Sequence, residues 1–351
     1  MSTPRHVLVR APNWVGDLVM ATPMLEAILA DPRFERVTIA VRAHLVDVLR
    51  GGPCEPHVLP LARGDDEAAL LRAAGADAAL LLSNSFGAAW RAWRARIPLR
   101  LGASLSGRAA LLTHRVVPPR RRGRRAAIPT AHLLRDVTGL LGVTTPSLRP
   151  RLYATADERD AARAELVGLG LGADEGYVLA SPGAAFGAAK LWPPERFAAA
   201  LDELHARRGL RGVVTGGPGE EPLMEAVVGA ARHPALSLAE VPRDLHRLKA
   251  LVRGAAALVV GDSGPRWYAA AFGVPCVTVL GPNSPELTAS SLERCAVVRV
   301  EDLECSPCLE RVCPLGHHRC MRELAPERVV EAAERLLGEP ASPTSTGAPS
   351  A

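Results

Sequence analysis

The chain alternates between short apolar segments and longer helical segments, and this alternation stops and then starts a second time. Strands are expected in the first series at residues 6–10, 36–41, 56–61 and 78–83, with helices at 18–30, 44–50 and 65–74. Strands are expected in the second series at residues 177–180, 211–216, 235–239, 257–261 and 276–280, with helices at 194–208, 221–231, 244–253 and 265–272. Because strands that alternate with helices form mainly parallel, doubly wound sheets, the pattern predicts an α/β protein. We expect two Rossmann-like domains that face each other across a ligand-binding cleft.

The segment that joins the two series sets the expected domain boundary. Residues 118–129 are rich in Pro, Gly and Arg and are expected to form a loop, whereas residues 157–169 predict a helix that lies between the domains. We place the N-terminal domain at 1–155 and the C-terminal domain at 156–337. Residues 338–351 are rich in Pro, Ser, Thr and Ala, a composition typical of a disordered tail.

Length and hydropathy exclude several classes of protein. A chain of 351 residues is long enough for two α/β domains. No apolar run reaches the roughly 20 residues that a membrane-spanning helix needs. The first residues do not resemble a signal peptide, so we expect a cytoplasmic protein.

The positive charge of the chain is concentrated in one segment. The formal net charge is +5, and Arg120, Arg121, Arg122, Arg124 and Arg125 lie almost side by side. Such a cluster favours a phosphate-bearing partner, which can be nucleic acid, anionic lipid or a phosphorylated glycolipid. A solvated surface loop is the alternative interpretation.

A glycine- and alanine-rich loop between Ser181 and Pro194 follows the first strand of the second series. Gly183 and Gly187 keep this loop thin, so that its backbone N–H groups and the next helix N-terminus can approach an anion. Lys190 supplies a mobile charge suited to a diphosphate. The alternative is an ordinary surface loop with a solvated lysine.

A second loop of this kind contains Asp262, Ser263 and Gly264, with Arg266 in the helix that follows. Its amides and hydroxyl can bind a phosphate, and Arg266 can add charge. Asp262 by itself is equally typical of a helix cap. Two such loops in one half of the chain strengthen the prediction of a nucleotide-sugar site.

A third loop ends in Glu220 and Glu221, again between a strand and a helix. A carboxylate at this place can bind ribose hydroxyls, as acidic residues do in other Rossmann sites. A helix-capping acid is the alternative.

A candidate general base lies in the first domain, in the segment from Asn13 to Asp17. Sugar transfer with inversion needs a carboxylate that takes the proton of the attacking acceptor hydroxyl, and Asp17 is suited to this role. A simple N-cap role for Asp17 is the alternative. The chain has no Asp-x-Asp element to hold a catalytic metal ion, which favours a metal-free reaction in which protein cations stabilise the leaving diphosphate.

Four of the seven cysteines gather near the C-terminus, at Cys305, Cys308, Cys313 and Cys320. With the neighbouring histidines they could hold a structural zinc ion or a cluster, although only the first spacing is typical of zinc ribbons. Reduced cysteines without a metal are the alternative, since disulfides are rare in the cytoplasm.

Six segments in order resemble the ADP-heptose:lipopolysaccharide heptosyltransferases of glycosyltransferase family 9, most closely their type II branch. The segments are Pro12-Asn-Trp-Val-Gly-Asp17, Pro182-Gly-Ala-Ala-Phe-Gly-Ala-Ala-Lys-Leu-Trp-Pro193, Asp262-Ser-Gly-Pro265, Gly273-Val-Pro275, Gly281-Pro-Asn-Ser-Pro285 and Cys305 to Cys320. The resemblance implies a GT-B fold and an inverting, metal-independent transfer of heptose from ADP-heptose to the inner core of lipopolysaccharide. It implies a phosphorylated glycolipid acceptor, contact with the inner membrane, and no nucleic acid.

The resemblance also implies a role for each matching residue. Asp17 is the expected general base and Lys190 the expected diphosphate ligand. Glu220, rather than Glu221, is expected to contact the ribose. Asp262, Ser263 and Gly264 are expected to line the part of the site that binds the phosphate and the sugar of the donor. Asn13 and the arginines at 120–122 are candidate acceptor contacts.

One position departs from the family pattern. The family usually has histidine three residues after the glycine of Asp-Ser-Gly, and this chain has Trp267 there. Tryptophan carries no charge and accepts no hydrogen bond, so the function of that histidine must be lost or taken over, with Arg266 the nearest candidate. A relative that uses another nucleotide-sugar, and a non-catalytic relative, therefore remain alternatives.

Two further classes of protein compete with a sugar transferase. A nucleic-acid-binding protein would use the basic run, but the chain lacks stacking motifs and a helix-turn-helix. A nicotinamide oxidoreductase would need a Gly-x-Gly-x-x-Gly loop after the first strand, which is absent from the sequence.

Overall fold

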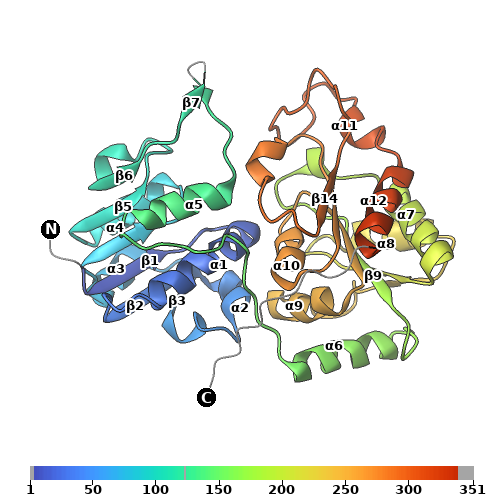
Figure 1. Cartoon of the computed structure of the whole chain (residues 1–351), viewed down its shortest axis with the longest axis horizontal. Helices are drawn as coiled ribbons and strands as arrows, with labels where there is room; N and C mark the ends of the chain where they lie inside the picture. Colours follow the sequence, from blue (N-terminus) through green and yellow to red (C-terminus); the bar gives the residue numbers. More distant parts are fainter. Residues whose placement is uncertain (1–3, 122–123, 339–351) are drawn as a thin grey trace. The chain divides into compact units, whose positions relative to one another are not determined.

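The computed structural model describes residues 4–121 and 124–338 (Figure 1). The chain divides into two compact units, one formed by Met1–Thr155 with Glu286–Ser290 and the other by Ala156–Pro285 with Ser291–Ala351. Each unit contains a six-stranded sheet in which all neighbouring strands are parallel. The prediction of two doubly wound α/β sheets is therefore confirmed.

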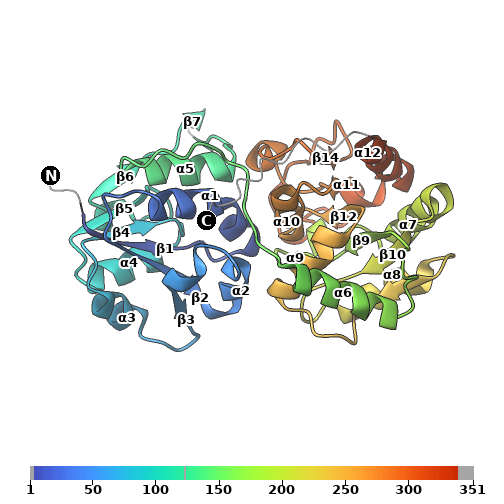
Figure 2. The ribbon, with the colours of Figure 1, turned by 60° about the horizontal axis from the view of Figure 1, so that its bottom comes forward.

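The sheet of the first unit has the strand order β3-β2-β1-β4-β5-β6. Its strands are β1 His6–Arg10, β2 Arg36–Arg42, β3 Val58–Leu61, β4 Ala78–Leu81, β5 Leu99–Ala103 and β6 His114–Val116. Its helices are α1 Val15–Leu29, α2 Val46–Leu49, α3 Glu67–Ala74, α4 Phe86–Arg94 and α5 Thr130–Gly139. Helices α1 and α5 pack together on one face of the sheet, and α3 packs with α4 on the other (Figure 2). Every residue of the central strands β1 and β4 is buried, which is why they are almost continuously apolar in sequence.

The sheet of the second unit repeats this order as β11-β10-β9-β12-β13-β14. Its strands are β9 Tyr177–Ser181, β10 Arg211–Val214, β11 Ala235–Ser237, β12 Ala257–Gly261, β13 Cys276–Val279 and β14 Cys295–Val298. Its helices are α6 Ala156–Gly168, α7 Pro194–Arg208, α8 Glu221–Ala230, α9 Leu245–Gly254, α10 Pro265–Phe272, α11 Arg319–Arg322 and α12 Pro326–Gly338. The Asp244 side chain accepts a hydrogen bond from the Arg247 N–H and caps α9, as its position before the helix indicates.

One prediction about the connecting segments was wrong, and another stays a prediction. Helix α6 packs on α9 within the second unit, where Glu165 forms a 2.7 Å ion pair with Arg247, and its expected place between the domains stays a prediction. The expected loop at 118–129 contains a short antiparallel ribbon in which β7, Arg120–Arg121, pairs with β8, Arg124–Arg125. Neither pair of arginines shows the alternation of apolar and polar residues that indicates a strand in sequence.

Two predicted properties concern the ends of the chain and the membrane. Within the described parts of the chain, no helix is both long enough and apolar enough to cross a bilayer. The expected disordered tail lies outside the described residues from position 339 onward. Gly338, the first residue assigned to that tail, still belongs to α12.

Candidate functional site

Each sheet has one point at which the direction of strand succession reverses. This switch point lies between β1 and β4 in the first unit, and between β9 and β12 in the second. In open α/β sheets, ligands bind at the carboxyl ends of the strands that flank such a point. The loops that carry Asn13, Lys190 and Asp262 follow these strands, whereas the loop that carries Glu220 follows the neighbouring strand β10.

The switch point of the second unit is crossed by an ion pair. Lys190 Nζ lies 2.5 Å from Asp262 Oδ2 and donates a second hydrogen bond, of 3.2 Å, to the Asp262 carbonyl oxygen. Asn283 Nδ2 donates to the same carboxylate oxygen at 2.6 Å. The two loops that the sequence predicts to bind phosphate are therefore joined directly. Because the carboxylate binds Lys190 and Asn283 while Gly264 occupies the N-cap position of α10, the interpretation of Asp262 as a helix cap is wrong.

The third loop joins the same place through Glu220. The Gly217 N–H donates to Glu220 Oε2 at 2.7 Å, which turns the carboxylate back toward the strand ends. A Cβ atom on Gly183 would lie 1.9 Å from Glu220 Oε2, so the glycine provides the space that the carboxylate occupies. Glu221 points elsewhere and forms an ion pair with Arg243. The structure thus brings Glu220, and not Glu221, to the Lys190 loop.

Helix α10 places the remaining residues of the Asp262 loop. The Ser263 hydroxyl is buried without a hydrogen-bond partner among the described residues, an arrangement that costs about 1–3 kcal/mol and is typical of functional sites. Arg266 is buried, with its Nε 3.4 Å from Cys295 Sγ and its guanidinium carbon 4.3 Å from the centre of the Trp267 ring. Trp267 is buried as well. The positive charge of Arg266 is therefore directed into the interior of the unit.

Phe186 adds a feature that the sequence analysis missed. Lys190 Nζ lies 4.7 Å from the centre of the Phe186 ring, and the Arg311 guanidinium carbon lies 5.1 Å from it. A ring face attracts cations, so Phe186 holds two of them beside the loop. Arg311 comes from the cysteine segment, residues 305–320, and no motif in the sequence predicted that this segment would contact the Lys190 loop.

The cysteine segment is bound to the Lys190 loop and to the loop at Gly281 by backbone and side-chain hydrogen bonds. The Ala189 N–H donates to the Arg311 carbonyl oxygen at 2.9 Å, and His318 Nε2 donates to the Ala189 carbonyl oxygen at 2.8 Å. A Cβ atom on Gly187 would lie 2.5 Å from the Arg311 carbonyl oxygen, so this close approach requires glycine. The Ser306 hydroxyl donates to the Gly281 carbonyl oxygen at 2.9 Å. The segment therefore supports the Lys190 loop from outside.

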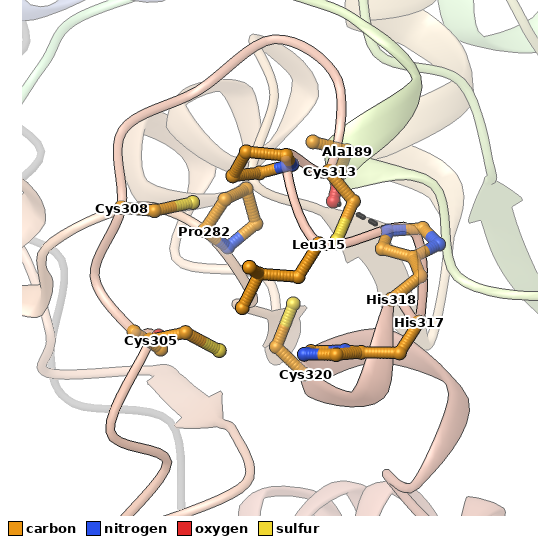
Figure 3. A pocket seen from close by; sticks show the side chains of 11 residues that line it. Ala189, Pro282, Cys305, Cys308, Cys313, Leu315, His317, His318 and Cys320 are labelled. Atoms are coloured by element: carbon orange, nitrogen blue, oxygen red, sulfur yellow. Dashed lines mark hydrogen bonds between the residues drawn. The ribbon is translucent and has the colours of Figure 1, made fainter.

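The four clustered thiols line one pocket together with His317 and His318 (Figure 3). Burial, followed by the three neighbouring thiols, raises the pKa of Cys320 to about 11. Among residues 4–121 and 124–338, however, no three histidine, cysteine or acidic side chains are arranged to hold a metal ion. All seven cysteines are free thiols.

The switch point of the first unit is crossed by a hydrogen bond. Asn13 Nδ2, after β1, donates to Ser83 Oγ, after β4, at 3.1 Å. Arg108 is buried and donates to the Ser83 carbonyl oxygen and, at 3.1 Å, to Asn84 Oδ1. Burial lowers the pKa of the Arg108 guanidinium to about 10, so it remains charged at neutral pH. Arg108 thus fixes the loop that faces Asn13.

A buried carboxylate next to this loop gathers three arginines. Glu67 lies 2.7 Å from Arg10, 3.2 Å from Arg42 and 3.5 Å from Arg91. Arg10 also donates to Asn13 Oδ1 at 2.9 Å, which fixes the orientation of the asparagine amide. The sequence alone did not predict that Arg10, at the end of an apolar strand, would bind this carboxylate.

Asp17 lies in the first turn of α1 and is partly buried. The N-cap position of this helix belongs to Trp14, so the interpretation of Asp17 as an N-cap is wrong. The carboxylate lies in the first turn of the helix, where the partial positive charge of the N-terminus stabilises an anion. A proton acceptor at this place is chemically reasonable.

The basic run is described only in part. Arg120 is exposed at the start of the β7–β8 ribbon. Arg122 lies outside the described residues, as do the side chains of Arg121, Arg124 and Arg125. The role of this run in acceptor binding stays a prediction.

Comparison with known proteins gives a consistent family. The family model described as glycosyltransferase family 9 (heptosyltransferase) matches residues 68–319, more than half of the chain. A lipopolysaccharide heptosyltransferase 2 of Salmonella typhimurium is 24% identical over 357 residues, covering 95% of this chain and 99% of the relative. A lipooligosaccharide heptosyltransferase 2 of Campylobacter jejuni is 29% identical over 160 residues, which is 45% of this chain. In that alignment, the chain spans about half (50%) of the relative's length.

Solved structures agree with the fold described above. The structure of E. coli ADP-heptose LPS heptosyltransferase II matches with a TM-score of 0.75 and 24% identity, over 95% of this chain and 98% of that one. A glycosyltransferase of family 9 from Veillonella parvula matches with a TM-score of 0.80 and 22% identity, over 95% and 97% of the two chains. The expected GT-B fold is confirmed. The chain belongs to glycosyltransferase family 9, the heptosyltransferase family.

Proposed function

We propose that the protein transfers heptose from ADP-heptose to the phosphorylated inner core of lipopolysaccharide, with inversion and without a catalytic metal ion. The observation that carries this proposal is the Lys190–Asp262 pair at the switch point of the second unit, with Glu220 turned toward the same loops. The names of the relatives support it, since the two from Salmonella and Campylobacter are both heptosyltransferases 2. In this proposal the first unit binds the acceptor and the second binds the nucleotide-sugar.

The donor ligands follow from the hydrogen-bonding capacity of each group. An ammonium group has three donors, and two of those on Lys190 are used by Asp262, so one remains for the diphosphate. Arg311 adds a second cation beside the same loop. Glu220 is assigned to the ribose hydroxyls. Ser263 and Gly264 offer a hydroxyl and backbone amides to the phosphate and sugar end.

The reaction needs a proton acceptor and a stabilised leaving group. Asp17 takes the proton of the acceptor hydroxyl as that oxygen forms a bond to the anomeric carbon. The bond between the anomeric carbon and the diphosphate oxygen breaks at the same time, and ADP leaves with the bonding electron pair. Lys190 and the loop amides stabilise the charge that develops on the diphosphate.

A screen of donors tests this proposal directly. ADP and ADP-heptose are expected to raise the melting temperature of the protein more than UDP, GDP, NAD or their sugars do. Mass spectrometry then measures the transfer of heptose to an acceptor that consists of lipopolysaccharide truncated in its inner core. Binding of ADP without transfer or hydrolysis of any nucleotide-sugar would favour the alternative that the protein is a non-catalytic relative. That alternative rests on Trp267, which is buried and replaces the histidine of the family. A preference for another base would favour a different donor.

We predict that neutralising the basic run weakens acceptor binding and leaves the affinity for ADP intact. Replacing Arg120, Arg121 and Arg122 by glutamine removes three charges, each worth about 1 kcal/mol near a phosphate-rich surface, so the KM for acceptor should rise at least about tenfold. Isothermal calorimetry with ADP is the control. Loss of ADP affinity would contradict this placement, and a gel shift with nucleic acid at physiological salt would support the competing nucleic-acid interpretation.

The structural zinc ion stays a prediction. If the four thiols of the cysteine segment bind one, purified protein should contain about one equivalent of zinc, and Cys308→Ser should lower both the metal content and the melting temperature. Elemental analysis after purification without chelators measures this. Less than about a tenth of an equivalent would reject the metal and leave four reduced cysteines.

A further inference from the structure

Helix α4 carries a stripe of exposed aromatic side chains, which we call the aromatic stripe: Phe86, Trp90 and Trp93. Residues spaced by four and three positions lie on one face of a helix. The three side chains are 49%, 41% and 47% exposed. Their rings stack in sequence, with centroids 6.4 Å apart between Phe86 and Trp90 and 4.9 Å apart between Trp90 and Trp93. The stripe is therefore one continuous apolar surface that extends about 10 Å along the helix.

The core of the unit does not need these rings. Helix α4 packs on the sheet through small residues, since Ala89 and Ala92 belong to the core cluster that includes Leu8 and Leu81. Ala88 is buried as well. The aromatic residues thus occupy the outer side of a helix whose inner side is already packed. A contiguous exposed apolar surface of this kind marks an interaction site.

The charged residues of the segment that contains the stripe all have one sign. Residues 82–100 contain four arginines and no aspartate or glutamate. Arg94 and Arg96 are exposed next to the stripe, while Arg91 turns toward Glu67 of α3. A partner that fits this surface must therefore present apolar groups to the three rings and negative charge to the adjacent arginines.

We propose that the aromatic stripe docks the first unit on an anionic lipid bilayer, with Trp90 and Trp93 at the level of the headgroups. Tryptophan side chains favour this region because their rings are apolar and their N–H groups remain hydrated. Arg94 and Arg96 then lie beside the lipid phosphates. The proposal deepens the proposed function, and rests on it in one respect: a glycolipid acceptor is presented at such a surface.

Two other occupants fit the surface less well. A second copy of the chain, joined by a two-fold axis through the stripe, would bring the same arginines face to face, which is unfavourable. A single sugar ring would cover one aromatic side chain, whereas the stripe presents three. Both occupants are outcomes of the test below.

Vesicle flotation with the full chain measures the docking. Wild-type protein should float with vesicles of phosphatidylglycerol and phosphatidylethanolamine and bind phosphatidylcholine vesicles weakly. Trp90→Ala/Trp93→Ala should lower the affinity for the anionic vesicles by at least about tenfold. In Arg94→Gln/Arg96→Gln, vesicle binding should lose most of its dependence on the fraction of anionic lipid. Leu292→Ala, at a 44% exposed leucine of the second unit, is the matched control and should bind like wild type. Unchanged flotation of the double tryptophan variant would overturn the proposal.

Quenching by brominated lipid locates the inserted residues. Trp192 and Trp267 are buried, so in a Trp14→Phe background the exposed tryptophans are those of the stripe. Vesicles that contain dibrominated phosphatidylglycerol should quench this fluorescence. Trp90→Phe/Trp93→Phe in the same background should still float and lose the quenching. Flotation with no quenching in the Trp14→Phe protein would place the contact elsewhere and overturn the proposal.

A pair of activity assays separates this proposal from the proposed function. The double alanine variant should transfer heptose normally to a deacylated, water-soluble acceptor and more slowly to acceptor embedded in vesicles. Vesicle binding that persists in a protein with no heptose transfer would refute the proposed function and still support docking. Equal loss on both acceptors would show that the stripe binds the sugar, and a change from dimer to monomer with unchanged flotation would show self-association. Either result would overturn the docking proposal.

Discussion

Asp17→Asn is expected to lower the rate of heptose transfer by about a thousandfold, because the acceptor hydroxyl then loses its proton acceptor. The substitution keeps the size of the side chain at the first turn of α1 and removes only the charge. Helix stability should change little, by about 0.5 kcal/mol, since one carboxylate near a helix N-terminus contributes that much. Transfer is measured by release of ADP and by mass spectrometry of the acceptor.

The controls for this variant lie in the same helix and at the same position. Glu26→Gln changes a carboxylate of α1 that bonds to Tyr153 and Arg151, and it should leave turnover unchanged. Asp17→Glu should restore part of the activity and its pH dependence. The affinity for ADP should be the same in all three variants. Wild-type turnover in Asp17→Asn would end the assignment of Asp17 as general base.

Lys190→Ala is expected to act on both the donor and the fold. Loss of one charge-assisted hydrogen bond to the diphosphate should weaken ADP binding by about 10- to 100-fold. The substitution also leaves the largely buried Asp262 carboxylate without its cation, which should lower the free energy of unfolding by about 3 kcal/mol. Calorimetric titration with ADP and chemical denaturation measure the two effects.

A double variant separates the two effects. In Lys190→Ala/Asp262→Asn no charge is left unpaired at this place, because Asn283 can still bond to the amide oxygen. Stability should therefore recover in large part, while ADP affinity should remain low. Recovery of ADP affinity together with stability would show that Lys190 only supports the loop. An unchanged ADP affinity in the single variant would reject Lys190 as a donor ligand.

The parts of the fold that the sequence predicted well are those with a strong local signal. The bounds of α7, β12 and α10 coincide with the predicted ones, since Pro194 and Pro265 mark the helix starts and Gly209 and Gly273 mark the ends. Helix α4 and strands β5, β6 and β14 were missed. In α4 the large apolar residues face outward and only alanines face inward, so the usual amphipathic pattern is reversed. No periodicity rule assigns such a segment to its sheet.

The candidate site was predictable as a set of loops and not as a set of contacts. Gly-rich composition after a strand located the Lys190 and Asp262 loops, but it did not predict the ion pair that joins them in the structure. The contact of Arg311 with Phe186 joins residues that are far apart in the sequence. A contact of this kind produces no local sequence pattern from which it could be predicted. The roles of buried Arg10 and Arg108 were not predictable for a similar reason, because Arg10 bonds to Glu67 and Arg108 bonds to Ser83 and Asn84, all of which lie more than 20 residues away in the sequence.

The close contact between Gly183 and Glu220 means that the residues at these two distant positions cannot be varied independently. With glutamate at 220 turned toward the strand ends, any side chain larger than hydrogen at 183 occupies the same space as the carboxylate. A designer who wishes to change the sugar-nucleotide preference of this scaffold therefore has to alter both positions in one step. In almost every variant of a single-site library at position 183, the new side chain would displace Glu220 from its place. Variants with a changed donor preference should therefore appear only when both positions are substituted together.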